Sequence, residues 1–256
     1  MDMGNKYTNR PGLRNADTGI RKVASTFGKA AFLTHAHKAQ GTRAVESDTE
    51  RFISNILGFE PSARAFEPQP FTVDLIGGAI LRTPEQRSAA RAKNKGLEGP
   101  IFYTPDFAVT WSDGTKEAQE IKLDTFPGEP EYEHRLRVAA EILWSHGYGF
   151  AKVVFPSYWQ HPLRMNVPLI HQAALRKDLC PPDATFEQIE QLFKAGATTA
   201  KDYCAGLSIS PRMLPVLLAF GALSMDIVKH QIRGDAPVTP AYGGLDHLEI
   251  LRRLAQ

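Results

Sequence analysis

The sequence predicts a mixed α/β protein, with helices flanking a mixed sheet, followed by a small helical unit of winged-helix type. Two patterns support this fold class. The first two thirds of the chain alternate between stretches with the apolar spacing of helices and stretches typical of strands. The last third changes to three short helical stretches followed by a strand, a turn and a strand. The 256 residues are enough for one large or two modest domains.

The first predicted element is a helix over residues 47–57, where the apolar residues recur at the spacing of one helix face. Residues 71–76 alternate in the manner of a strand. Residues 82–99 are polar and rich in Arg and Lys, which is typical of a surface loop. We therefore expect a helix, a strand and an exposed loop in this order.

A β-hairpin comes next. Residues 101–111 and 116–123 have the composition of strands, and a short Ser-Asp-Gly turn joins them. Residues 130–146 predict a helix ended by a glycine, and residues 149–155 predict a further strand. These elements complete the predicted α/β domain.

The C-terminal third has a different pattern. Residues 185–194, 199–206 and 211–218 predict three short helices. Residues 221–228 then predict a strand, and residues 233–240 are rich in turn formers. Three helices followed by a strand-turn-strand unit indicate a winged-helix-like domain.

The charge is distributed unevenly, although the formal net charge is only +2. Residues 1–45 carry eight Lys and Arg against two Asp and Glu, residues 46–175 have a net charge of −4, and residues 176–256 are neutral. We therefore divide the chain into a basic N-terminal arm at 1–45, the α/β domain at 46–169 and the winged-helix-like domain at 170–256. Such an arm suits loose binding along DNA phosphates, and a merely solvated tail fits its charge equally well.

Composition excludes several classes of protein. No run of apolar residues is long enough to span a membrane, and the first residues lack the apolar region of a secretory signal. Two cysteines cannot supply a disulfide framework or four zinc ligands. We expect a cytoplasmic protein with no membrane partner.

The segment that carries chemistry is the predicted hairpin, which holds Asp106 and, after 13 intervening residues, Glu120-Ile-Lys122. Residues two apart on a strand share a face, so the side chains of Glu120 and Lys122 leave the sheet together. The position of Asp106 relative to them depends on the turn.

The register of the hairpin decides where Asp106 lies. If the turn has three residues, with Gly114 in the left-handed conformation, Trp111 pairs with Thr115 and Asp106 lies opposite Glu120. A two-residue turn shifts the register by one residue and makes the two acids diagonal neighbours. The first register suits a shared site better.

Two carboxylates and a lysine at one sheet edge meet the needs of phosphodiester hydrolysis. Carboxylates hold Mg²⁺, which activates water and neutralises charge growing on phosphate oxygens. A lysine ammonium binds a phosphate oxygen or orients the water. The alternative is an ordinary exposed strand face, because Glu-x-Lys is a common tripeptide.

A third acid is expected from the preceding helix, and the candidates are Glu46 and Glu50. Glu50 shares a stripe with apolar residues and points inward. However, Ser47-Asp-Thr-Glu50 is also a capping-box sequence, in which Glu50 reaches back to the backbone of Ser47. The spacing alone leaves the two roles of Glu50 equally open. Asp74 is a weaker candidate that fits an ordinary strand-end acid better.

These residues carry a resemblance to a known family. The segments concerned are Glu46-Ser-Asp-Thr-Glu50, Phe66-Glu-Pro-Gln-Pro70, Tyr103-Thr-Pro-Asp106-Phe and Glu120-Ile-Lys122. Together they resemble the TnsA-type endonuclease subunit of heteromeric cut-and-paste transposases, among the restriction-enzyme-like PD-(D/E)xK nucleases. The resemblance covers residues 45–156, and the C-terminal unit resembles the winged-helix domain of that family. It implies a restriction-endonuclease-like fold for the domain at 46–169.

The resemblance also implies a function. Glu50, which matches the helix acid of an S-x-x-E motif, is expected to be catalytic alongside Asp106, Glu120 and Lys122. Some family members have Gln where this chain has Glu120. Because this chain has Glu at that position, its acidic set is complete, and Glu50, Asp106 and Glu120 are expected to hold Mg²⁺, with Mn²⁺ as a substitute.

The implied activity belongs to a larger assembly. The resemblance implies a subunit that hydrolyses the phosphodiester at the 5′ ends of a transposon in double-stranded DNA. A TnsB-type DDE transposase cuts the other strand, and a TnsC-type AAA+ ATPase is the second protein partner. We expect the subunit in the bacterial cytoplasm, associated with the nucleoid when assembled.

Two other functions remain open. One is a stand-alone restriction or repair nuclease of the PD-(D/E)xK class. The other is a catalytically inert winged-helix regulator that binds DNA. Residues 176–256 are neutral, and residues 211–218 offer only Arg212 as a cation, which favours a protein-binding role for the C-terminal unit.

Overall fold

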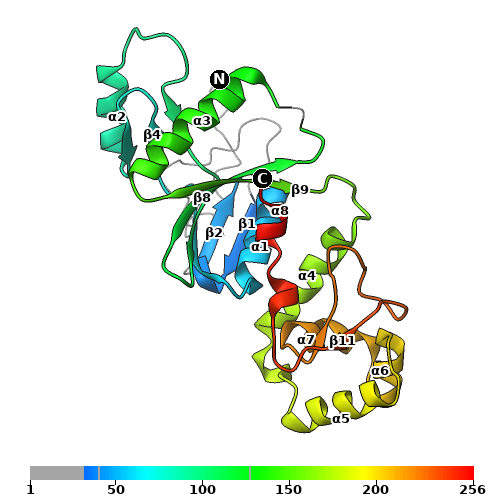
Figure 1. The fold of residues 1–256 in the computed structure, drawn as a ribbon. Coiled ribbons are helices and arrows are strands. Elements are labelled where there is room, and N and C mark those ends of the chain that lie inside the picture. Colours follow the sequence, from blue (N-terminus) through cyan, green and yellow to red (C-terminus); the bar gives the residue numbers. More distant parts are fainter. Residues whose placement is uncertain (1–31, 40, 127) are drawn as a thin grey trace, which may run out of the picture.

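The computed structural model describes residues 32–39, 41–126 and 128–256 (Figure 1). Its main sheet has four strands in the order β3-β7-β8-β9. The pairs β3–β7 and β7–β8 are antiparallel and the pair β8–β9 is parallel, so the sheet is mixed as predicted. The strands are β3 (Ala63–Pro68), β7 (Phe107–Trp111), β8 (Lys116–Leu123) and β9 (Gly149–Phe155).

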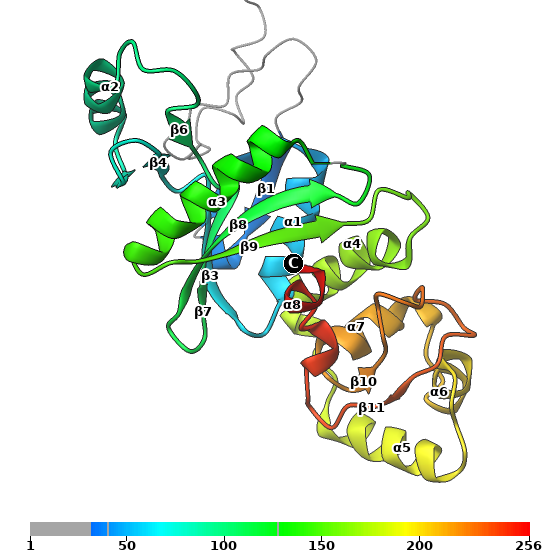
Figure 2. The same ribbon diagram turned by 45° about the horizontal axis from the view of Figure 1, so that its top comes forward.

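Two helices cover the two faces of this sheet (Figure 2). Helix α1 (Asp48–Phe59) begins where the side chain of Ser47 accepts the N–H of Glu50, and its apolar side joins the larger core with β7 and β8. Helix α3 (Pro130–Ser145) packs on the other face, where Leu136 and Leu143 join a second core. The predicted mixed α/β class is confirmed.

The hairpin β7–β8 has the register that the three-residue turn predicts. The N–H of Trp111 donates to the carbonyl of Thr115 (2.9 Å), and Gly114 has a φ of +86°. The ladder continues to the pair Phe107–Gln119. A side chain at Gly114 would be disfavoured by this left-handed backbone, which explains the glycine.

A small lobe is inserted between β3 and β7 (Figure 1). The expectation of a surface loop at residues 82–99 was wrong, because helix α2 (Pro84–Lys93) occupies much of it. Thr83 and Gln86 form a capping box, but only Ala90 of the helix is buried, so the helix lacks the apolar stripe on which the sequence analysis relied. A three-stranded sheet in the order β5-β4-β6 completes the lobe. Its strands are β4 (Thr72–Asp74), β5 (Ala79–Leu81) and β6 (Phe102–Tyr103).

The expected basic arm at 1–45 is partly folded. Residues 1–31 and 40 lie outside the described residues. Strands β1 (Phe32–Ala36) and β2 (Gly41–Val45) pair antiparallel around the 3₁₀ turn η1 (His37–Ala39). Ala39 and Val45 belong to the larger core, so this part of the range is attached to the body and is not a loose arm.

The C-terminal unit contains the three expected helices and a short two-stranded pairing of β10 with β11. Its elements are η2 (Lys177–Leu179), α5 (Asp183–Lys194), α6 (Ala200–Gly206), η3 (Pro211–Met213), α7 (Leu214–Ala219), β10 (Leu223–Ser224), β11 (Thr239–Pro240), η4 (Asp246–Leu248) and α8 (Leu251–Leu254). The order agrees with the sequence analysis, and the winged-helix identity stays a prediction.

Helix α4 (Pro162–Leu175) joins the two units and was not expected, because Pro168 in its middle is a sequence signal against a helix. It packs against both α1 and α7. A boundary between residues 169 and 170 therefore falls inside one helix, and the larger core is continuous across it.

The end of the chain returns to the main sheet (Figure 1). The carboxylate of Glu60 accepts the N–H groups of Ile250 (2.9 Å) and Leu251 (3.1 Å) at the start of α8. The N–H of Gln256 then donates to the carbonyl of Lys152 on β9. In the part of the chain described here, no helix has the length and apolarity needed to cross a membrane.

Candidate active site

Glu120 lies in the second half of β8 and is buried, with 5% of its surface exposed. Its Oε2 accepts the hydroxyl of Tyr103 (2.7 Å), and its Oε1 accepts the ammonium of Lys122 (2.8 Å) and the hydroxyl of Tyr132. Glu120 and Lys122 leave the same face of the strand, as their spacing predicts. Because α3 supplies Tyr132, this is the face that α3 covers.

Asp106 lies immediately before β7, one residue beyond the last pair of the ladder. The expected pairing of Asp106 with Glu120 is not formed, because the N–H of Asp106 donates to the carbonyl of Gln119 (3.0 Å). Its Oδ2 instead accepts the backbone N–H of Ile121 (2.7 Å), which lies between Glu120 and Lys122. Asp106 therefore joins the same part of β8 through its side chain.

Glu50 lies in the first turn of α1 and is buried. Its Oε1 accepts the hydroxyl of Ser47 (2.8 Å), and its Oε2 accepts the N–H of Glu46 (2.9 Å). The N–H of Glu50 donates in turn to Ser47 Oγ. This is a helix cap like the one expected, except that the carboxylate reaches the backbone of Glu46 rather than that of Ser47.

The charges of neighbouring carboxylates affect the protonation of Asp106 and of Glu50. The pKa of Asp106 is raised well above its usual range, first by burial and then by the charges of Glu120 and Glu50. Burial also raises the pKa of Glu50, and Glu46 and Glu120 add to this shift. The structure thus brings Glu50, Asp106, Glu120 and Lys122 together from α1, β8 and the residue before β7.

The two weaker acids have different positions. Glu46 precedes α1, is partly exposed, and contributes its charge and its backbone N–H to Glu50. Asp74 lies in the inserted lobe, where its Oδ1 accepts Nδ2 of Asn94 (3.1 Å) and the N–H groups of the following turn. Asp74 therefore has a structural role at the end of β4, in agreement with its interpretation as an ordinary strand-end acid.

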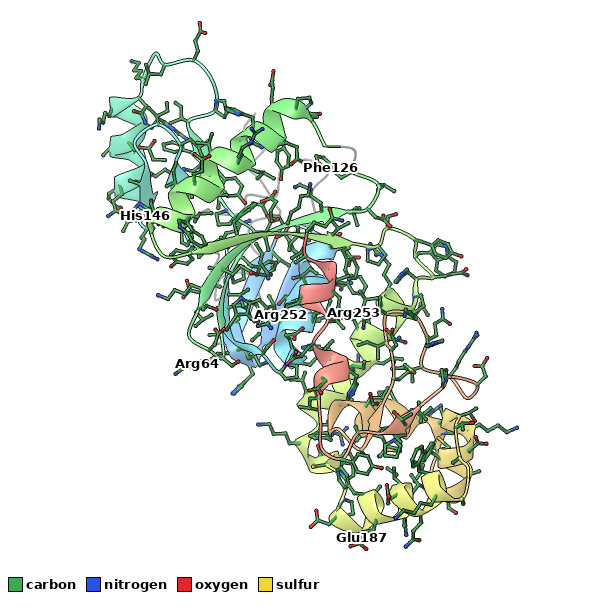
Figure 3. All side chains as sticks on the ribbon, viewed as in Figure 1. Arg64, Phe126, His146, Glu187, Arg252 and Arg253 are labelled. Atoms are coloured by element: carbon green, nitrogen blue, oxygen red, sulfur yellow. The ribbon has the colours of Figure 1, made fainter. Side chains whose placement is uncertain are left out.

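Lys122 is held in place by aromatic rings as well as by Glu120. Its ammonium lies 4.9 Å from the ring centre of Tyr132 and 5.3 Å from that of Phe126. A surface hollow of about 370 Å³ opens beside it, lined by the end of β8, by Phe126 and by Ser47 and Thr49 at the start of α1. Phe126 marks this end of the domain in Figure 3.

Sequence analysis did not assign a role to Tyr103 or Tyr132. Tyr103 belongs to the segment that ends in Asp106, and its place in that motif was a signal that could have been used. Tyr132 lies on α3, and only the packing of α3 on β8 brings it to Glu120. No local sequence pattern predicts such a contact.

The donor set suits Mg²⁺ chemically, because that ion takes oxygen ligands and commonly binds one or two carboxylates together with water and phosphate. Among the described residues, Asp106 Oδ1 has no hydrogen-bond partner, while both oxygens of Glu50 are used in the helix cap. As the side chains stand, the described part of the chain has no group of three His, Cys, Asp or Glu residues able to hold a metal ion. Asp106 and Glu120 are the residues best placed to hold one.

Comparison of the chain with protein-family models gives no match, and comparison with curated proteins gives none either.

A larger hollow, of about 640 Å³, lies at the opposite end of β8 beside Trp144 and His146. Among the described residues, Glu117 is the one acid that lines it. His146 marks this end in Figure 3, far along α3 from Phe126. The acidic cluster, rather than the larger hollow, is therefore the candidate active site.

Proposed function

We propose that this chain is the metal-dependent DNA endonuclease subunit of a heteromeric transposase, of the TnsA type. It hydrolyses the phosphodiester at the 5′ ends of the transposon. The observation that carries the proposal is the cluster of Glu50, Asp106 and Glu120 next to Lys122, in which burial and then the charges of Glu120 and Glu50 raise the pKa of Asp106. Groups with strongly shifted pKa values cluster at functional sites.

A bound Mg²⁺ supplies Lewis acidity and an activated water. The residues of the chain supply position. The N–H of Ile121 fixes Asp106 Oδ2, so that the free Oδ1 is available to a ligand. Glu120 is fixed in the same way by its three donors.

Lys122 supplies the positive charge for the phosphate. Its ammonium is partly exposed, with 22% of the side-chain surface accessible, and it borders the hollow beside α1. The start of α1 lines the same hollow, and a helix N-terminus attracts anions through its unpaired N–H groups and dipole. The hollow is where we place the scissile phosphate, within reach of Lys122 and next to the acids.

The assembly with partners follows from the resemblance of the four sequence segments to TnsA-type subunits. Under this proposal a TnsB-type DDE transposase and a TnsC-type AAA+ ATPase bring the subunit to transposon ends. The acidic charge of residues 46–175 disfavours tight DNA binding by this part alone, which suits a nuclease that acts within a complex.

The direct test is cleavage of transposon-end DNA by the full chain mixed with its candidate partner subunits and Mg²⁺. We expect 5′-end cleavage that is abolished by EDTA and by Asp106→Ala. Cleavage by the chain without partners would support a stand-alone nuclease instead. DNA binding with no cleavage under any of these conditions would support the inert regulator.

A further inference from the structure

Glu120 receives hydrogen bonds from three side chains that belong to three different elements. Tyr103 comes from β6, Lys122 from β8 and Tyr132 from α3. Both tyrosine hydroxyls can donate without changing the charge of the site. They differ in this respect from Lys122, which adds a positive charge.

Counting acceptor positions shows what this arrangement leaves open. An ionised carboxylate has about four lone-pair positions, two on each oxygen. Lys122 and Tyr132 take the two positions on Oε1, and Tyr103 takes one on Oε2. One position on Oε2 therefore stays available for a cation or a water molecule.

The two tyrosines are themselves firmly held. Tyr103 is 5% exposed, and its ring packs edge-on against Phe150. The ring of Tyr132 packs edge-on against Phe126, with the guanidinium of Arg135 4.9 Å from its centre. The two hydroxyl groups therefore have little freedom to move, and the carboxylate of Glu120 between them is held in one orientation.

We propose that Tyr103 and Tyr132 are positioning residues that orient Glu120 and leave a single Oε2 position facing the reaction. This inference rests on the proposed function, since it assigns a role to residues around the same site. Partners of this kind around a ligating carboxylate commonly change metal affinity by roughly 10- to 100-fold when they are removed. The alternative is that Tyr132 blocks Glu120 and must leave before a cation binds.

The two roles predict opposite results for Tyr132→Phe and Tyr103→Phe. Mn²⁺ binding to the full chain can be followed by the loss of the electron paramagnetic resonance signal of the free ion. If the tyrosines position Glu120, each variant binds Mn²⁺ roughly 10- to 100-fold more weakly than the wild type. If Tyr132 blocks the site, Tyr132→Phe binds Mn²⁺ as tightly as the wild type or more tightly, and the proposal is overturned.

Cleavage by the assembled complex gives a second readout. We expect kcat to fall in both variants while KM for DNA stays unchanged, and we expect a higher Mg²⁺ concentration to restore part of the loss. A purely structural defect would not be rescued by the metal. Loss of activity without such rescue therefore counts against positioning.

Tyr203→Phe is the matched control, because Tyr203 is a buried tyrosine whose hydroxyl donates to the carbonyl of Ala197 in the C-terminal unit. It should bind Mn²⁺ as the wild type does. Asp106→Ala separates the two levels of the argument. If the wild type binds no Mn²⁺, or if Asp106→Ala leaves binding unchanged, the proposed function itself fails. If Asp106→Ala abolishes binding and both tyrosine variants bind normally, only the positioning role fails.

Discussion

The carboxylate of Asp106 accepts the backbone N–H of Ile121 over 2.7 Å. Because Ile121 lies between Glu120 and Lys122, this bond ties the acid before β7 to the residues that carry the rest of the site. The ladder between β7 and β8 ends at the preceding pair, Phe107 with Gln119. At the end of the hairpin Asp106 thus contacts β8 twice, through its backbone N–H to the carbonyl of Gln119 and through its side chain to the N–H of Ile121.

The first prediction concerns the hydrolytic centre. Asp106→Ala or Lys122→Ala should reduce cleavage by the assembled complex by at least about 100-fold, since Lys122 stabilises charge at the phosphate and Asp106 is placed to hold the metal ion. Circular dichroism and thermal unfolding should show a folded protein. Lys116→Ala is the control, because Lys116 lies at the other end of the same strand, over the ring of Tyr148. Cleavage at the wild-type rate by either site variant would remove that residue from the centre.

The second prediction separates the two roles of Glu50. In Glu50→Gln the amide oxygen can still accept one of the two hydrogen bonds from Ser47 and the N–H of Glu46, so the unfolding free energy should change by no more than about 1 kcal/mol. A neutral amide is a poorer ligand for Mg²⁺, so cleavage should fall by roughly 10-fold or more.

Glu46→Gln is the matched comparison for this experiment. We expect it to cut DNA nearly as well as the wild type, because Glu46 acts on Glu50 through its backbone N–H and its charge. If Glu46→Gln loses cleavage and Glu50→Gln does not, the helix acid is Glu46. If both cut normally, α1 contributes only a cap.

The third prediction concerns pH. The folded protein raises the pKa of Asp106, so it binds a proton more tightly than the unfolded chain does. Stability therefore falls as the pH rises from the unfolded value, about 3.9 for Asp, through the raised folded value. Asp106→Asn removes this loss and should raise the unfolding free energy at pH 7 without metal. Urea unfolding between pH 4 and pH 8 measures both the gain and the flatter pH dependence.

Metal provides the check on this interpretation. Mg²⁺ should stabilise the wild type in proportion to its binding and should leave Asp106→Asn nearly unchanged. If Asp106→Asn is less stable than the wild type at pH 7, Asp106 is a structural acid whose role is its hydrogen bond to Ile121 rather than the binding of a metal ion.

The hairpin shows what the sequence could predict. Its turn, its register and the shared face of Glu120 and Lys122 depend on residues that are neighbours along the chain, and all three are found in the structure. The end of the ladder at Phe107 was not foreseen, because the N–H of Asp106 donates to the carbonyl of Gln119 while its side chain accepts the N–H of Ile121.

Other features were missed because they depend on contacts between residues that are far apart in the sequence. Tyr132 reaches Glu120 only through the packing of α3 on the sheet. Helix α2 is stabilised by its cap and by the bond of Asn94 to Asp74, with almost no apolar face to reveal it. Helix α4 continues through Pro168 because both of its sides are packed, against α1 and α7.

The fourth prediction concerns the DNA surface. Arg91, Lys93 and Lys95 are exposed at the end of α2, which the Asn94–Asp74 bond anchors. Replacing all three with Gln should weaken duplex binding and lower the slope of log affinity against log salt by about 2–3, because fewer counterions are released. Deleting residues 1–31 should act in the same direction, since most of the N-terminal positive charge lies there.

The control is a triple replacement of exposed lysines in the C-terminal unit: Lys177, Lys194 and Lys201, each to Gln. It removes the same charge and should leave the salt slope unchanged. An equal loss in both triple variants would mean that the protein binds DNA through its net charge alone. An unchanged slope for α2 would leave its cations as a solvated surface.

The C-terminal unit is expected to bind a partner protein, and the structure decides how to test this. A fragment that begins at residue 170 would cut through α4 and expose its contacts with α1 and α7. Surface variants of the full chain are therefore the better experiment. Two exposed aromatic residues are available: Phe193 on α5, and Tyr242, whose hydroxyl reaches Glu190 one turn earlier on that helix.

The fifth prediction is that Phe193→Ser combined with Tyr242→Ser weakens binding to the ATPase or transposase subunit by at least about 10-fold. Aromatic residues near the centre of an interface commonly contribute most of its affinity, and the neutral charge of residues 176–256 gives the unit little attraction to phosphates. Duplex DNA affinity of the full chain should stay unchanged. Trp144→Ser, at an exposed aromatic residue on α3, is the control and should bind the partner subunit and duplex DNA as the wild type does. If the double variant keeps its protein partners and loses DNA, the C-terminal unit contacts DNA directly, and delivery of the nuclease by protein docking is the wrong account of this unit.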